Sequence, residues 1–97
     1  MTGTLYSAGV PVPRFFFDTY DGERFVSDEQ GQELEDIEAA KIIAQEELPQ
    51  MAWDELPDGD QRTFIVSVRD GAGQVVIRAA LSLVVEYPSK EAGSAPD

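Results

Sequence analysis

The chain has 97 residues, a formal net charge of −12 at pH 7, and neither histidine nor cysteine. This length forms one domain with a modest core, and the two missing residue types exclude disulfides, thiolate or imidazole metal sites, and catalysis by a cysteine or a histidine base. The negative charge argues against nucleic acid as a partner, because phosphate backbones carry the same sign.

The acidic residues are concentrated in one segment. Residues 28–60 hold twelve acids and one base, Lys41, whereas the rest of the chain holds seven acids and six bases. A solvated helix face is the simpler interpretation of this segment. An acidic surface that binds a basic protein is the alternative.

The first thirteen residues contain two glycines and two prolines without periodicity, and we expect them to form a flexible arm. They have neither a basic start nor a long apolar segment, so no secretory signal is predicted. No apolar run is close to the length of about 18 residues that a helix needs to cross a bilayer. A cytoplasmic protein without a membrane partner is the expectation.

The first strand is predicted at Arg14–Tyr20, with Phe15 and Phe17 facing the core. The turn dipeptide Asp21-Gly22 follows, and residues 23–27 can return as a short second strand with Phe25 inward. Residues 28–36 are polar and are predicted to form a loop.

A helix is predicted after Asp36, which is a good N-cap residue. Pro49 falls inside this helix, where it removes one backbone hydrogen bond, so we expect either a kink or a break with a second short helix to about residue 56. Trp53 is assigned to packing between helix and sheet. The apolar face of the helix follows spacings of three and four: Ile37, Ala40, Ala44, Leu48 and Met51.

Residues 63–87 read as a long β-hairpin whose turn contains Gly71 and Gly73. The predicted register pairs Val68 with Val75, Val66 with Ile77 and Phe64 with Ala79. In that register, residues 81–87 need a further partner, either the first strand or the same strand of a second copy. The tail, residues 88–97, is polar and is predicted to be disordered.

The expected fold is therefore α+β, in the order β-β-α-β-β, with a mostly antiparallel sheet and the Pro49-kinked helix on one face. Residues 14–87 form the single domain. The opposite face of the sheet is unusually apolar for a solvent-exposed face, and it is the predicted interaction surface. Its candidate residues are Phe16, Tyr20, Ile65, Val76, Arg78 and Val84.

No motif predicts catalysis. Asp54, Asp58 and Asp60 resemble part of a calcium loop, but Leu56 and Pro57 occupy positions that need oxygen ligands or flexibility. We interpret these aspartates as turn-forming residues. The sequence thus predicts no catalytic, cofactor-binding or metal-binding residues, and a protein that is not an enzyme.

Four separated motifs within residues 13–86 resemble a family of small acidic alphaproteobacterial proteins known only as a domain of unknown function. They are PRFFFDTYDGERF, GQELEDIEAAKIIA, WDELPDGD and RDGAGQVVIRAALSLVVE. This resemblance implies no activity, cofactor or catalytic residue, and Pro49 departs from the unbroken helix that it implies. The stretch GQELEDIEAAKIIAQEEL also resembles the helix start of HicB-type antitoxins, which are small acidic proteins with an open sheet and one helix.

Two functions are compatible with these observations. The first is a non-catalytic protein-interaction module that self-associates through its sheet. The second is an antitoxin-like or regulatory protein that uses the acidic residues 28–60 against a basic partner.

Overall fold

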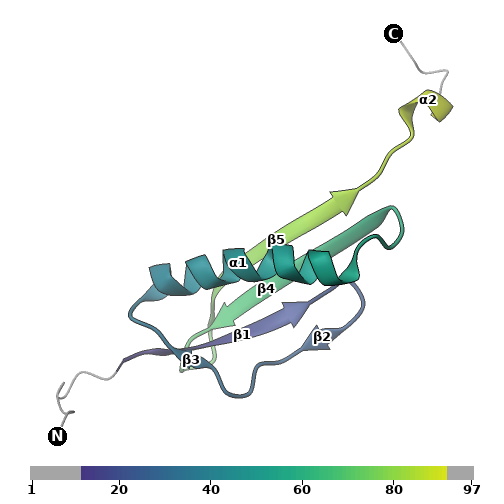
Figure 1. The fold of residues 1–97 in the computed structure, drawn as a ribbon. Coiled ribbons are helices and arrows are strands. Elements are labelled where there is room, and N and C mark those ends of the chain that lie inside the picture. Colours follow the sequence, from purple (N-terminus) through teal and green to yellow (C-terminus); the bar gives the residue numbers. More distant parts are fainter. Residues whose placement is uncertain (1–11, 92–97) are drawn as a thin grey trace, which may run out of the picture.

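The computed structural model describes residues 12–91, which form one sheet with a long helix lying across one face (Figure 1). This arrangement confirms the α+β class and the predicted β-β-α-β-β order. Parts of the predicted flexible arm and tail, residues 1–11 and 92–97, lie outside the described residues. The elements are β1 (Arg14–Tyr20), β2 (Phe25–Val26), β3 (Gln32–Glu33), α1 (Ile37–Glu55), β4 (Gln61–Arg69), β5 (Val75–Val84) and α2 (Pro88–Glu91).

The sheet is antiparallel, with the strand order β2-β1-β4-β5. β1 lies beside β4, and Phe17 is opposite Val68. The short strand β3 pairs with the start of β1. The prediction of a loop throughout residues 28–36 is therefore wrong at Gln32–Glu33, because β2 pairs only with Thr19 and Tyr20 and leaves backbone groups at the start of β1 to pair.

The register of the β4–β5 hairpin differs from the prediction by two residues. Val68 is opposite Ile77 and Phe64 is opposite Leu81, and a β-bulge lies between Val68 and Arg69. The loop spans residues 70–74, and the Asp70 carboxylate accepts the Gln74 N–H at 3.0 Å, which stabilises the longer turn. Because β4 begins at Gln61, it pairs with β5 through Val84, so the expectation that β4 leaves residues 81–84 without a partner is wrong.

The core lies between α1 and the central strands. Four sheet residues and three helix residues are buried: Phe15, Phe64, Val66, Val68, Ala40, Ala44 and Leu48. The two alanines let the helix backbone approach the sheet closely. Phe17 packs against this core as predicted, whereas Phe25 is 62% exposed, so its inward orientation is wrong. Strand β2 lies outside β1, whereas α1 packs against β4 and β5, and the helix therefore does not cover Phe25.

The helix begins as predicted. The Asp36 carboxylate accepts the Ala39 N–H at 3.0 Å, which confirms the N-cap. α1 continues through Pro49 to Glu55, so the predicted alternative of a break with a second helix is wrong. Gln45 and Pro49 both lie on the exposed side, where water can bind the carbonyl group that the proline leaves without a donor.

The segment after β5 contains one further short element. Pro88–Glu91 form the four-residue helix α2, although residues 88–97 are predicted to be disordered. Proline fits the start of a helix, where its missing N–H has no partner to lose.

Candidate functional site

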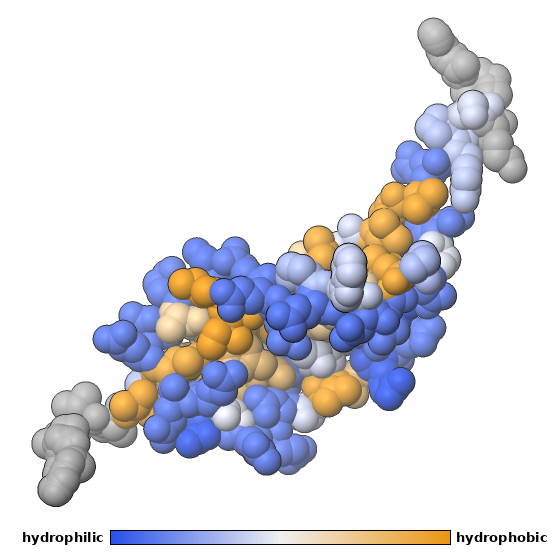
Figure 2. Space-filling view, viewed as in Figure 1, coloured by the Kyte–Doolittle hydropathy of each residue, from blue (hydrophilic) through white to orange (hydrophobic). Residues whose placement is uncertain are grey.

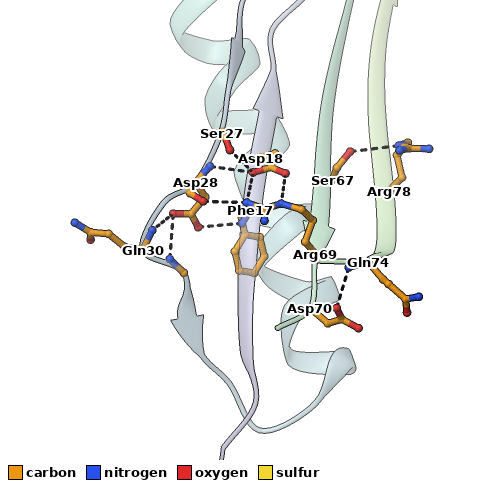
Figure 3. A network of polar contacts seen from close by, with 11 residues as sticks. Phe17, Asp18, Ser27, Asp28, Gln30, Ser67, Arg69, Asp70, Gln74 and Arg78 are labelled. Atoms are coloured by element: carbon orange, nitrogen blue, oxygen red, sulfur yellow. Dashed lines mark hydrogen bonds and ion pairs between the residues drawn. The ribbon is translucent and has the colours of Figure 1, made fainter. Parts of the chain in front are cut away.

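A buried carboxylate on the face of the sheet opposite α1 is the first candidate for chemistry (Figure 3). Asp18 is only 6% exposed and accepts hydrogen bonds from Arg69 Nε at 2.6 Å and Nη2 at 3.0 Å. It also accepts the Asp28 N–H at 2.9 Å and the Ser27 hydroxyl at 3.4 Å. The hydrogen bond from Arg69 is the main reason that the pKa of Asp18 lies below its usual value.

Asp28 fastens the loop of residues 27–31 onto β1. Its carboxylate accepts the N–H groups of Phe17 at 2.9 Å and of Gln30 and Gly31 at 3.1 Å each. Burial of the carboxylate opposes ionisation, but these three donors outweigh it and lower the pKa of Asp28. Both carboxylates are therefore ionised structural acceptors with their oxygens in use, which leaves neither available as an acid, a base or a metal ligand.

A second buried charge joins three parts of the fold. The Arg62 side chain is 5% exposed, and its guanidinium donates to the Asp21 carbonyl and to the carboxylates of Asp58 and Glu55. Asp58, interpreted above as a turn residue, thus also anchors the turn to β4. Within residues 12–91, no group of three acidic side chains is placed to hold a metal ion.

The predicted interaction surface is divided by polar contacts. Arg69 crosses it to reach Asp18, and the guanidinium lies 5.0 Å from the centre of the half-buried Phe16 ring. Tyr20 is opposite Ile65, and its hydroxyl donates to the Gly22 carbonyl at 3.0 Å.

The other three residues predicted for this surface lie on β5. Val76 lies at the bulge and packs against the core, away from its predicted position. Arg78 donates to the Ser67 hydroxyl at 3.3 Å, and Val84 is opposite Gln61 at the end of the strand. The structure thus places Tyr20 opposite Ile65, separates Phe16 from them by the Asp18–Arg69 pair, and leaves Val84 at the end of β5.

The outer edge of β5 is an unpaired strand edge within residues 12–91, since no described strand pairs with it. Val85 donates its N–H to the Asp60 carbonyl at 2.7 Å, which shows that the odd-numbered residues of this part of β5 direct their N–H and C=O groups toward β4. Hydrogen-bonding direction alternates along an antiparallel strand, so the even-numbered residues direct their N–H and C=O groups outward. These residues are Arg78, Ala80, Ser82 and Val84.

An apolar groove, here called the edge groove, lies beside this edge. It has a volume of about 620 Å³ and lies between the end of α1 and the second half of β5. Figure 2 shows hydrophobic side chains gathered along this part of β5. Its lining residues are Pro49, Ala52, Trp53, Leu56, Pro57, Gly59, Leu81, Leu83 and Val85.

Trp53 dominates the exposed apolar surface of the edge groove. It is 86% exposed, so its assignment to packing between helix and sheet is wrong. The apolar core stripe of α1 turns away from it, toward β4. An indole exposed to this degree is unusual in a folded chain and marks a surface suited to association.

A comparison with protein families matches residues 14–82 to the domain of unknown function DUF6894. The chain belongs to the DUF6894 family. No curated protein and no solved structure matches it. The part of this DUF6894 chain that the structure describes contains no helix that is both long and apolar enough to cross a membrane.

Sequence reasoning missed the edge groove, although a signal for it was present. Ile42, Pro49 and Trp53 are spaced by seven and four residues, which places them on one side of the helix, apart from the core stripe. Ile42 and Trp53 are both exposed in the DUF6894 chain. This second apolar stripe indicates that α1 has another surface to cover, but the sequence does not reveal that it borders a strand edge.

Proposed function

We propose that this DUF6894 chain is a non-catalytic protein-interaction module. It binds an extended segment of polypeptide along the outer edge of β5, and apolar side chains of that segment enter the edge groove. The observation that carries the proposal is the coincidence of an unpaired strand edge with the exposed Trp53. The proposed setting is the cytoplasm of an alphaproteobacterium.

The chemistry of β5 supports this function. Natural sheet edges are protected by charged residues, prolines or bulges. In β5 the bulge and the one charged residue, Arg78, lie in its first half. Residues 79–85, AALSLVV, have no such protection, and they border the edge groove. Each backbone hydrogen bond made along this edge contributes about 0.5–1.5 kcal/mol net, and burial of apolar side chains adds to it.

The contacts of four acids support the non-catalytic part of the proposal. Asp18 and Asp28 accept four and three hydrogen bonds, and Glu55 and Asp58 are paired with Arg62. These four acids therefore stabilise the fold instead of forming a reactive pair.

A photo-reactive amino acid placed at Ala80 tests the proposal in cells that produce the protein naturally. We expect the exposed edge position to cross-link to a polypeptide, identified by mass spectrometry as another protein or a second copy. The same group at Glu29, which is exposed in the loop beside β1, is the control. Equal yields at the two positions, or no product at Ala80, would refute binding through the β5 edge.

A second candidate is the antitoxin-like or regulatory protein that uses residues 28–60 against a basic partner. Its support is the charge of that segment. Several of these acids already have partners, because Glu33 pairs with Arg14, Glu38 with Lys41, and Glu55 with Arg62. Fewer acids of this segment are therefore available for a basic partner than the sequence suggests, so we rank this function second. A cross-linked partner at Glu29, which lies in this segment, whose binding to the purified protein is lost at high salt would favour it.

A further inference from the structure

We propose that the segment bound at the β5 edge is β5 of a second copy of this chain, paired antiparallel about a twofold axis at Ser82. This inference rests on the proposed function and names its partner. The two sheets then join into one continuous sheet, in which each copy supplies the strand that the other lacks.

The outward direction of the N–H and C=O groups of the even-numbered residues of β5 allows this pairing. Ser82 directs its N–H and C=O outward, so it can exchange two hydrogen bonds with the partner's Ser82. Ala80 then pairs with the partner's Val84, and the same two bonds form again by symmetry. The backbone groups that β4 leaves unused in the second half of β5 all receive partners.

The side chains are complementary in this register. On the face that carries the edge groove, Leu81 lies opposite the partner's Leu83, and Ala79 lies opposite the partner's Val85. On the other face, Arg78 lies opposite the partner's Glu86, which gives two cross-strand ion pairs per dimer. The segment between these pairs, residues 79–85, has no charged side chain.

Neighbouring registers lose this charge complementarity. An axis at Leu81 places Arg78 opposite the partner's Val84, and an axis at Leu83 places Ala80 opposite the partner's Glu86. The repulsion between two chains of charge −12 makes the position of the few basic residues important. The opposite charges of Arg78 and Glu86 therefore select Ser82 as the axis.

The same axis brings the two edge grooves together. Leu81 and Leu83 line the groove and flank Ser82 on either side. Each groove is therefore adjacent to the partner's β5, and Trp53 leaves water when the dimer forms. The inference thus accounts for the exposed indole as well as for the unpaired edge.

Sedimentation velocity from about 1 µM to about 1 mM, together with Trp53 fluorescence, tests the inference. We expect a reversible dimer with a blue-shifted emission. Arg78→Glu and Glu86→Arg each place like charges opposite one another, and each weakens dimerisation about tenfold or more. The double variant Arg78→Glu/Glu86→Arg restores it. Arg24→Glu, an equal charge change at an exposed turn residue, is the control and has no comparable effect.

Ala80→Pro tests the edge itself. The Ala80 N–H points outward, so proline removes no hydrogen bond to β4 and prevents only the pairing with the partner. Circular dichroism verifies that the variant folds; should it not, the charge exchanges still decide. We expect a monomer at all concentrations.

The outcomes separate the inference from the proposed function. A wild-type chain that stays monomeric at about 1 mM overturns the second copy as partner, while an Ala80 cross-link to a different protein still supports the interaction module. A dimer that the double charge exchange does not restore overturns the axis at Ser82. A dimer unaffected by Ala80→Pro overturns the edge as its interface. No edge-specific cross-link in cells, to itself or to another protein, refutes the proposed function itself.

Discussion

The substitution Gly31→Ala, which adds a single methyl group, should destabilise the loop that packs on β1. The φ angle of Gly31 is +71°, a conformation that L-residues rarely adopt. A Cβ atom at this position would lie 2.8 Å from the Phe15 carbonyl oxygen and 2.9 Å from two ring carbons of Phe16. Phe15 is buried and paired with Gln32, so its carbonyl cannot move away without disturbing β1.

The cost of Gly31→Ala has two parts. The positive φ angle contributes about 1–2 kcal/mol for an alanine. Relief of the short contact moves the loop and weakens the hydrogen bond from the Gly31 N–H to Asp28, which adds about 1–2 kcal/mol. The free energy of unfolding should therefore fall by about 3 kcal/mol in total.

Urea denaturation followed by circular dichroism measures this loss. Gly59→Ala is the matched control, because Gly59 also has a positive φ angle, +78°, but a Cβ atom there would meet nothing within 4 Å. We expect the control to lose only the conformational part, about 1–2 kcal/mol. Equal losses for the two variants would show that the short contact with β1 carries no energy, and would refute the close packing of this loop.

Three further results are expected. The pKa values of Asp18 and Asp28 are lowered on folding, so the stability that these carboxylates provide is complete above the unfolded pKa of about 3.9 and declines as the pH falls through their folded pKa values. Acid denaturation of the wild type and of Asp28→Asn checks this, and an unfolding free energy that does not change with pH below about 4 would contradict it. Asp36→Ala should destabilise by about 1 kcal/mol because α1 loses its N-cap, whereas Glu35→Ala, one residue earlier and exposed, should change thermal unfolding little. Trp53→Ser should alter the unfolding free energy of the monomer by less than about 0.5 kcal/mol, and a larger loss would mean that the indole packs within its own chain.

The sequence by itself determined the elements and the faces of this protein. The period-two pattern around Phe64, Val66 and Val68 identified the strands, and Asp36 identified the start of the helix, because both signals are local. The register prediction was wrong by two residues, yet it assigned the correct side of the sheet to these three residues. A slip by an even number of residues changes the cross-strand partner and keeps the side chains on their faces, except at the bulge, where Val76 moves to the core side.

Only the tertiary structure decided what lies next to what. The position of β1 beside β4 buries Asp18 against Arg69 and places β5 at the edge of the sheet, although these residues are far apart in the chain. Trp53 and Phe25 both read as core residues, but Trp53 lies on a side of α1 that does not face the core, and Phe25 lies on β2, outside the strands that α1 covers. Hydrophobicity shows that a side chain is more stable when it is buried, whereas the arrangement of the elements decides whether the same chain buries it. At the β5 edge, we propose that a second copy buries it.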